Sequence, residues 1–463
     1  MGNAPEATTE NANLTPLDPE IVRGLVAELT EHDHWSRIKL INHQQNLLAE
    51  LLRHATTHSP YYRDTIASYL EREAAFETFP ILTKSQLVAN FDCIVTDRRL
   101  RLNEVESHLA GPNAGALLFG QYRACATGGT SGERAILVYD QASWELGAAN
   151  ALRFMRALEI GPETRVLGIG APTPLHISNR MFAELRAGRS SLPRLAVTSP
   201  LPEVVAGLNA FQPEALVTYP SFMRRLVEEK SEGRLKISPR LICSIAEALT
   251  DDVRNLVHDT WNIRVIDGYG TTETGMRGME CLHVAGIHLP EDLIIYEVVD
   301  DENRNVPVGR AGRKVLITTL TNKVLPLIRY ELSDIVTLAD GACACGRPYI
   351  RIAKIEGRRE ETLCLPSREG GCIEIHAGRL RSPLIRTPGI RQFQIVQGND
   401  HLTIMVSIRD AARGEEISAA IRRDVQDTLA RAGVAEIDLR IQLVESIALA
   451  GTGAKEKLLT RSS

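Results

Sequence analysis

The chain has 463 residues, of which 44% are hydrophobic and 24% charged, and its formal net charge is -5 with a pI near 6.2. This length exceeds what one hydrophobic core usually organises, so we expect at least one large and one small domain. The acidic balance offers no basic surface to nucleic acid, and no run approaches the roughly 20 apolar residues that cross a bilayer, so neither is an expected partner.

The N-terminal segment, residues 1–19, is rich in Asn, Thr, Glu and Pro and contains no apolar core segment. We therefore expect a flexible leader, and its composition does not match a signal peptide. Secretion is disfavoured, and the sequence predicts a cytoplasmic protein. In a reducing compartment, most of the 8 cysteines should be free thiols or metal ligands.

The first half of the chain carries alternating helix and strand patterns. Residues 38–54 repeat apolar side chains at helical spacing, and Pro60 follows the run, which predicts an amphipathic helix. A second helical pattern covers residues 142–156. Short apolar runs, typical of strands, lie at residues 165–169, 215–219 and 240–245. The alternation of strands and helices along the chain predicts an α/β sheet.

The pattern changes twice towards the C-terminus. After about residue 292, β-rich stretches at 294–299 and 314–319 predict a subdomain of hairpins. Strand-like segments at 392–408 and 437–444 flank a helical pattern over 415–432, which predicts a compact α+β domain. We expect a large α/β N-terminal domain over residues 20–356 and a small α+β C-terminal domain over 357–463.

Three separated stretches together supply the parts of an ATP site. A loop of small residues can wrap phosphate oxygens with backbone N–H groups and hydroxyls. The loop consists of Thr127, Gly128, Gly129, Thr130, Ser131 and Gly132. The segment 269–273, Tyr-Gly-Thr-Thr-Glu, ends in a carboxylate that can hold magnesium, and Asp334 can accept hydrogen bonds from ribose hydroxyls.

Each stretch also has an ordinary interpretation. Clusters of Gly, Thr and Ser commonly mark turns, and this loop fails as a Walker A motif because Glu133 and Arg134 replace the Gly-Lys-Ser/Thr ending. Glu273 can equally belong to a capped loop. The order and distances of the stretches favour the nucleotide interpretation.

A second constellation has the composition of a metal site. Cys343 and Cys345 are separated by one residue, and Cys281 and His288 lie in a loop directly after the Glu273 segment. Three thiolates and an imidazole match a tetrahedral structural zinc site, for which His283 competes as the imidazole and free core cysteines are the alternative. Packed thiols are expected at Cys93, Cys125, Cys243, Cys364 and Cys372.

In order along the chain, these motifs resemble the signatures of the adenylate-forming superfamily, most closely the branch of phenylacetate-coenzyme A ligases. The similarity covers nearly the whole chain. It includes a Gly-Arg segment at residues 357–361, where the family has an interdomain hinge, and Lys455, where the family carries its catalytic lysine. The resemblance implies the adenylate-forming fold, in which the small domain is mobile.

The resemblance also implies residue roles. Glu273 would hold magnesium, Thr272 and the small-residue loop would contact phosphate oxygens, and Lys455 would bridge the acid and the α-phosphate, with Lys457 as its competitor. Asp334 and Arg358 would contact the ribose, and Arg358 could also reach the α-phosphate. The adenine would lie against Ala246, Glu247 and Tyr269, followed by Gly270 and Thr271 of the same nucleotide-binding segment.

The implied activity is ATP- and magnesium-dependent adenylation of a small aromatic carboxylic acid, followed by transfer to coenzyme A. The alternative keeps adenylation but changes the acceptor to an amine or a carrier-protein thiol, or the acid to a small oxyacid such as nitrite activated toward an amine. A degenerate nucleotide-binding regulator or a zinc-organised interaction protein is a third hypothesis. A homodimer is left open, as is a coenzyme A role for the arginines of residues 379–391.

Overall fold

The computed structural model describes residues 17–127, 134–173, 175–186, 194–275, 277–283, 286–447 and 458–461. The chain begins with three helices, α1 (Pro19–His32), α2 (Arg37–His58) and α3 (Pro60–Glu71). The Asp18 side chain accepts hydrogen bonds from the first backbone N–H groups of α1, and Leu17 is buried. Residues 17–19, which we expected in a flexible leader, therefore start the packed fold.

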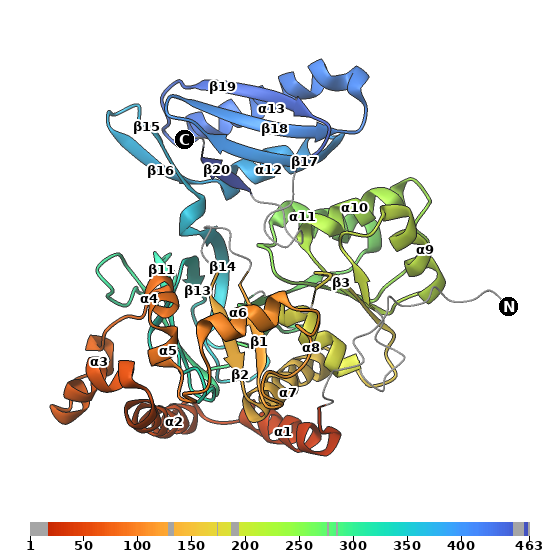
Figure 1. The fold of residues 1–463 in the computed structure, drawn as a ribbon. Coiled ribbons are helices and arrows are strands. Elements are labelled where there is room, and N and C mark those ends of the chain that lie inside the picture. The colour runs from red at the N-terminus through yellow and green to blue at the C-terminus, as the bar shows by residue number, and fades with distance from the viewer. Residues whose placement is uncertain are drawn as a thin grey trace.

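A large lobe, α1 to β14, and a C-terminal lobe, β15 to β20, follow each other along the chain (Figure 1). The further helices of the large lobe are α4 (Lys84–Ala89), α5 (Phe91–Ile94), α6 (Leu102–Ala110), α7 (Gln141–Ala157), α8 (Ile177–Arg186), α9 (Leu201–Phe211), α10 (Pro220–Ser231) and α11 (Asp251–Trp261), with the short 3-10 helix η1 (Phe76–Thr78).

A nine-stranded sheet forms the centre of the large lobe, in the order β13-β14-β9-β8-β7-β6-β5-β3-β4. Its parallel half consists of β3 (Val166–Gly170), β4 (Arg194–Ala196), β5 (Ala215–Thr218), β6 (Leu241–Ser244) and β7 (Val265–Gly270). The antiparallel half continues through β8 (Arg277–Glu280), β9 (Ile287–His288), β14 (Arg351–Arg358) and β13 (Asp334–Leu338). Alternation of strand and helix thus gives the expected α/β sheet.

Two smaller sheets complete the large lobe. A hairpin pairs β1 (Arg123–Ala126) with β2 (Ile136–Tyr139), and a three-stranded sheet contains β10 (Ile294–Val299), β11 (Lys314–Thr319) and β12 (Tyr330–Leu332). The predicted stretches 294–299 and 314–319 are confirmed as strands β10 and β11. Every residue of β11 is buried, which accounts for the apolar run of residues 315–317 within it.

The 3-10 helix η2 (Arg359–Glu361) leads into the C-terminal lobe, which begins with the hairpin of β15 (Thr362–Pro366) and β16 (Cys372–His376). A four-stranded sheet follows, in the order β19-β18-β17-β20. Its elements are α12 (Gly378–Arg386), β17 (Ile390–Gln397), β18 (His401–Ile408), η3 (Ala411–Arg413), α13 (Gly414–Arg431), β19 (Asp438–Val444) and β20 (Leu459–Arg461). The segment 392–408, expected as one strand, is the hairpin β17–β18.

Polar contacts hold the C-terminal lobe against α10 and α11. Arg409 forms ion pairs with Glu228 and with Glu232, the latter at 3.0 Å, and Ser382 donates to the Asp252 carboxylate. An apolar cluster also contains residues of both lobes. Two arginines of the stretch considered for coenzyme A phosphates join this contact: Arg381 donates to the Ala248 carbonyl and Arg386 faces Asp252.

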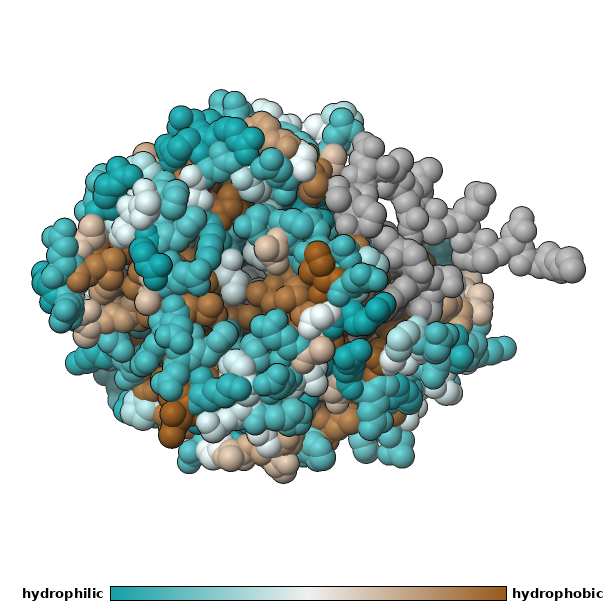
Figure 2. Space-filling model, turned by 90° about the horizontal axis from the view of Figure 1, so that it is seen from below, coloured by the Kyte–Doolittle hydropathy of each residue, from teal (hydrophilic) through white to brown (hydrophobic). Residues whose placement is uncertain are grey.

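The opposite face of the large lobe, which carries α1 to α3, is mostly hydrophilic with interspersed hydrophobic side chains (Figure 2). Ile21 of α1 and Ile38 of α2 are among the exposed hydrophobic residues, with 50% and 73% of their surface accessible. Among the helices that the structure describes, none combines the length and the apolar character needed to cross a membrane.

Candidate active site

Strand β7 delivers the segment 269–273 to the carboxyl edge of the parallel strands, the edge where α/β sheets bind ligands. Beyond the strand, the Thr274 hydroxyl accepts from the Thr271 N–H at 3.3 Å and donates to the Thr271 carbonyl at 3.0 Å. Gly275 has φ +65, and a Cβ there would lie 2.7 Å from the Tyr139 ring. The turn bearing Glu273 is therefore closed by hydrogen bonds and needs glycine at its end.

Tyr269, Asp334 and Arg358 come together although they are far apart in sequence. Asp334 starts β13 and Arg358 ends β14, and the register of these strands places them directly opposite each other. The Tyr269 hydroxyl donates to Asp334 Oδ2 at 2.8 Å, while Arg358 Nε lies 3.4 Å from Oδ1. Tyr269 and Arg358 thus orient both carboxylate oxygens of Asp334, the residue predicted to bind the ribose.

The charges in this group determine its protonation. Asp334 first, and then Glu273 and the hinge glutamates, raise the pKa of the Arg358 guanidinium above its ordinary range. Burial raises the pKa of Tyr269 well above its ordinary value, so its hydroxyl remains a neutral donor. Because the charge of Glu273 contributes to the raised pKa of Arg358, the predicted magnesium ligand lies close enough to this guanidinium to act on it. A glutamate, an aspartate and an arginine therefore share one neighbourhood.

The hairpin β1–β2, which carries the small-residue loop, packs against the Glu273 turn. The Tyr139 hydroxyl donates to the Thr272 carbonyl, and the Glu273 carbonyl lies 3.4 Å from it. Thr127 closes the end of the hairpin: its N–H donates to the Ala135 carbonyl at 2.9 Å and its hydroxyl accepts from the Ala135 N–H at 3.0 Å. Thr127 therefore has a structural role in the hairpin in addition to any contact with phosphate.

Several expected site residues lie outside the described residues. They are Gly128, Gly129, Thr130, Ser131 and Gly132 of the loop, together with Lys455 and its competitor Lys457.

The two adenine candidates after β6 are described and have distinct local roles. Ala246 adopts a left-handed conformation with φ +68. Glu247 accepts from the Ser221 N–H and from its hydroxyl, both at 3.1 Å, at the first turn of α10. A carboxylate at a helix N-terminus is favourable on its own, so this contact gives Glu247 a capping role beside the nucleotide edge of the sheet.

Two glycines of β3 make room for side chains of the large lobe. A Cβ on Gly168 would lie 2.9 Å from the Phe182 ring, and one on Gly170 would lie 2.5 Å from the Arg194 guanidinium. Phe182 and Arg194 therefore fill the space beside these glycines. Further along the same edge, the Ala171 N–H donates to the Tyr219 hydroxyl at 3.0 Å.

The structure gathers the four predicted metal ligands into one cluster. One donor atom from each of Cys281, His288, Cys343 and Cys345 lies within 4.8 Å of every other. The sulfurs of Cys281 and Cys343 are 3.6 Å apart, and Cys345 Sγ is 3.5 Å from His288 Nε2. Burial lowers the pKa of His288 to about 4, which keeps the imidazole neutral, as a metal ligand must be. His283 does not belong to this cluster.

The cluster joins segments that are distant in sequence. His288 lies on β9, which pairs with Arg351 of β14, and a Cβ on Gly278 of β8 would lie 2.1 Å from the His288 carbonyl oxygen. Next to Cys345, Arg347 donates to Asp33 after α1 at 3.0 Å. The cluster therefore joins the central sheet to the loop between β13 and β14, and the neighbouring Arg347 links that loop to Asp33 after α1.

Three of the cysteines expected as packed thiols are not packed: Cys93 is exposed, and Cys364 and Cys372 pair with each other. Cys364 and Cys372, expected as packed thiols, form a disulfide across the hairpin β15–β16, with Cα atoms 5.8 Å apart. Both residues are exposed on the hairpin. The register of the hairpin brings them together, and the Gly370-Gly371 turn between them is a signal that the sequence contained.

Similarity to known proteins extends over much of the chain. No protein-family model matches the chain. A phenylacetate-coenzyme A ligase of Thermus thermophilus is 28% identical over 50% of this chain and 52% of its own length. The phenylacetate-coenzyme A ligase of Escherichia coli is 24% identical over 87% of this chain and 86% of its own length. This chain thus spans about half of the first relative and most of the second.

Among solved structures, a 2-hydroxyisobutyryl-CoA ligase in the postadenylation state matches with a TM-score of 0.69 at 20% identity, covering 93% of this chain and 91% of the other. The chain has the fold of the adenylate-forming ligases. Its relatives confirm the predicted resemblance to the phenylacetate-coenzyme A ligase branch. The carboxyl ends of the parallel strands β3 to β7 lie along one edge of the sheet. Strand β14 of the same sheet leads to the C-terminal lobe.

Proposed function

We propose that this adenylate-forming protein is an ATP-dependent ligase that activates a small carboxylic acid as its acyl-adenylate and transfers the acyl group to coenzyme A. The observation that carries the proposal is the group of Tyr269, Asp334 and Arg358 beside Glu273, at the carboxyl edge of the parallel strands. The names of the phenylacetate-coenzyme A ligases support transfer to coenzyme A, and the 2-hydroxyisobutyryl-CoA ligase solved in the postadenylation state supports an adenylate intermediate.

In the proposed reaction, the acid carboxylate attacks the α-phosphate, an acyl-adenylate forms and pyrophosphate leaves. Asp334 accepts from the ribose hydroxyls while Tyr269 holds its carboxylate in place. Arg358 supplies a forked cation between the ribose and the reacting phosphate. Glu273 is the proposed magnesium ligand, because a carboxylate oxygen suits this hard cation, and a bound magnesium ion would neutralise phosphate charge. Thr272 and residues 127–132 contact phosphate oxygens.

The proposal assigns the cation at the attacking carboxylate to Lys455 of the C-terminal lobe. This lobe would turn about residues 357–361 between the two half-reactions, so its position decides which chemistry the site supports. The proposed domains are accordingly residues 20–356 and 357–463. We also propose an aromatic acid as the substrate, on the strength of the phenylacetate ligases, and a cytoplasmic location.

The same proposal includes structural zinc. With Zn–S near 2.3 Å and Zn–N near 2.05 Å, a tetrahedral site needs sulfurs about 3.8 Å apart and a sulfur–nitrogen separation of about 3.6 Å. The observed 3.6 Å between Cys281 and Cys343 and 3.5 Å between Cys345 and His288 fit both edges. Four protein ligands leave no open position for substrate, so the metal would fasten the loops and take no part in the reaction.

Pyrophosphate release tests the proposed activity. Purified protein is mixed with ATP, magnesium and a panel of aromatic acids, aliphatic acids and nitrite, with and without coenzyme A, and adenylate and thioester are measured by mass spectrometry. We expect acid-dependent release and an acyl-CoA product. The variant Asp334→Asn should lose most activity, whereas Cys93→Ser, which changes an exposed thiol, is the matched control.

Two outcomes would redirect the proposal. Acid-dependent pyrophosphate release without a thioester would select an amine or carrier-protein acceptor, and release with nitrite alone would select an oxyacid. Absence of release with every acid, from protein that still binds ATP, would refute the ligase and favour a nucleotide-binding regulator.

A further inference from the structure

The hairpin β15–β16 directly follows the proposed hinge and has two different faces. On one face, Leu363, Leu365 and Ile375 are buried in the apolar cluster. The other face carries the disulfide of Cys364 and Cys372, and both cysteines are exposed. Alternate residues of a strand point to opposite faces, so Glu374 shares the face of the disulfide. A reductant in solution can therefore reach these sulfurs.

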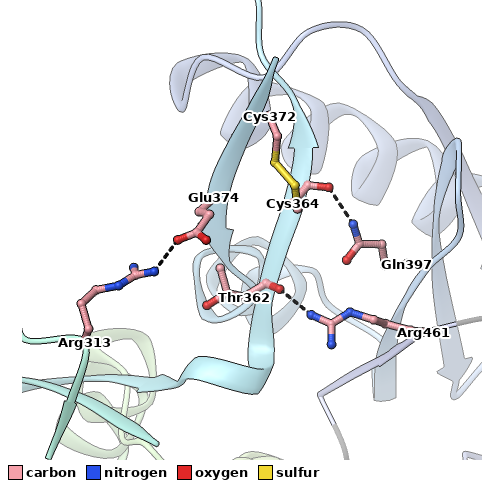
Figure 3. Close-up of a disulfide and its surroundings, with 7 residues drawn as sticks. All are labelled: Arg313, Thr362, Cys364, Cys372, Glu374, Gln397 and Arg461. Atoms are coloured by element: carbon pink, nitrogen blue, oxygen red, sulfur yellow. Dashed lines mark hydrogen bonds and ion pairs between the residues drawn. A yellow bond between two sulfur atoms is a disulfide. The ribbon is translucent and has the colours of Figure 1, made fainter. Parts of the chain in front are cut away.

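Glu374 connects this face to the large lobe (Figure 3). It lies directly opposite Cys364 in the hairpin register, and its carboxylate is 2.6 Å from Arg313, in the segment between β10 and β11. Arg313 also contacts Asp301 at 3.0 Å, and Asp301 lies 3.6 Å from Arg359 of the hinge. We call these four residues the hinge clamp, because their alternating charges run from the hairpin to the hinge.

The first strand of the hairpin is attached to the C-terminal sheet instead. The Cys364 carbonyl accepts from Gln397 at 2.7 Å, and the Thr362 carbonyl accepts from Arg461 at 2.9 Å (Figure 3). The disulfide therefore links β15, which is held by the C-terminal sheet, to β16, which reaches the large lobe through Glu374. It lies in the mechanical connection between the two lobes.

The ion pair between Glu374 and Arg313 depends on how firmly the backbone of β16 holds Glu374 in place. The Glu374 and Arg313 side chains are 55% and 35% exposed. An exposed pair gains little from Coulomb attraction in water and loses side-chain entropy when it forms. Its strength therefore depends on how firmly the backbone already places the carboxylate. A covalent link two residues from Glu374 restricts the backbone of β16 in that way.

We propose that Cys364–Cys372 is a reversible thiol–disulfide site that sets the strength of the hinge clamp. On reduction, an external dithiol attacks the disulfide and the S–S bond between Cys364 and Cys372 breaks. Both cysteines become thiols, and the dithiol becomes a disulfide. Two electrons and two protons pass to the protein, so the exchange balances. The oxidised hairpin holds Glu374 on Arg313 and stabilises the present position of the C-terminal lobe, and reduction releases it.

The redox state can be read directly because of where trypsin cuts. Cleavage after Arg359, Arg368 and Arg379 gives peptides 360–368 and 369–379, each with one of the two cysteines. Protein purified without reductant and blocked with N-ethylmaleimide should show these peptides linked. Dithiothreitol should separate them, and oxidised dithiothreitol should relink them. Peptides that carry N-ethylmaleimide from the start and stay separate after oxidation would overturn the proposal.

The effect on the hinge is measured by hydrogen exchange. The Arg359 N–H donates to the Ser333 carbonyl at 2.8 Å, so its exchange reports opening of the hinge. We expect reduction to speed this exchange about two- to fivefold, the range that a partly exposed ion pair spans. Glu374→Gln should exchange at the faster rate in both redox states. Cys93→Ser should behave like the parent protein.

The double variant Cys364→Ser/Cys372→Ser separates the disulfide from other effects of the reductant, such as loss of metal from the Cys281 cluster. It should match the reduced parent in both buffers. Equal acceleration by reductant in this variant, or in Glu374→Gln, would overturn the proposal, as would unchanged exchange in the reduced parent. Neither measurement requires catalytic turnover, so failure of the proposed ligase activity would not be confused with failure of the redox site.

Discussion

Replacing Cys345 with serine should remove the metal and loosen the large lobe. Serine keeps the size of the side chain but replaces the thiolate with a weak hydroxyl ligand, leaving two sulfurs and one imidazole. The cluster then lacks the fourth corner of its tetrahedron. Because Arg347 next to the cluster contacts Asp33, the loss should be felt as far as the N-terminal helices.

The size of the effect follows from the loop that the metal closes. Cys281 and Cys343 are 62 residues apart in sequence. Cross-linking a loop of about this length stabilises the folded state by about 4 kcal/mol in the chain-entropy model. An unfolding entropy of roughly 2.1 cal/mol/K per residue makes this a fall in Tm of about 4 °C for the whole chain. We expect up to this loss, since three ligands retain some affinity.

The assay combines calorimetry with metal analysis. The parent and Cys93→Ser should contain about one zinc per chain, Cys345→Ser much less, and a strong chelator should lower the parent Tm to that of the variant. A variant that still holds one zinc would remove Cys345 from the ligands. A Tm difference that persists after both proteins have lost their metal would show that the thiol stabilises the fold by packing and that the reasoning is wrong.

Two further predictions concern the proposed site, and a third concerns Asp267, a buried residue of β7. Tyr269→Phe removes a buried hydrogen bond to the Asp334 carboxylate and should cost about 1.5–3 kcal/mol in denaturant unfolding; a loss below about 0.5 kcal/mol would contradict the bond. Lys455→Ala should slow pyrophosphate release about 10²- to 10³-fold with ATP affinity kept, while Lys457→Ala, the matched control, should not; the reverse result would exchange their roles. Burial raises the pKa of Asp267 to about 7, so between about pH 4 and pH 7 the folded protein binds a proton that the unfolded chain has lost. Its contribution to stability should therefore fall as pH rises through this window, by at most about 1.4 kcal/mol per pH unit, and Asp267→Asn should flatten that slope in denaturant unfolding; an unchanged slope would show that other groups cause it.

Local patterns were sufficient for much of the fold. The apolar run of β11 was readable because the whole strand is buried, and the helix predicted over 38–54 is confirmed within α2. The hairpin β17–β18 was merged into one strand, although Gly398 marks the turn: its N–H donates to the His401 carbonyl at 2.9 Å. Two strands with the same alternation look continuous unless the turn residues are given more weight.

The cluster of Cys281, His288, Cys343 and Cys345 was predictable because thiols and imidazoles have a recognisable ligand chemistry. The spacing of Cys343 and Cys345 suggested a site, and Cys281 and His288 completed a set of three sulfurs and one imidazole. Choosing His288 over His283 required the structure, because only the pairing of β9 with β14 brings that imidazole to the thiols. Sequence distance gives no information about such a register.

The contact between Tyr269 and Asp334 could not be predicted for the same reason. The two residues are 65 positions apart, and the bond exists because β7 and β13 belong to one sheet with β8, β9 and β14 between them. The resemblance assigned the tyrosine ring to adenine and left its hydroxyl without a role. The sequence therefore supplied the site residues, while the side-chain partner that orients Asp334 came from tertiary structure.

Strand β14 connects the features discussed above. It begins at Arg351, which pairs with His288 of the metal cluster, and ends at Arg358, which pairs with Asp334. At about 3.3 Å per residue, its eight residues span roughly 25 Å. The C-terminal lobe follows directly, so the part of β14 before the proposed hinge at residues 357–361 would stay in the sheet if that lobe turns as proposed. The proposed structural metal, at the start of β14, would secure the register that places Asp334 opposite Arg358, which would give it a role in the proposed ligase without any part in the chemistry.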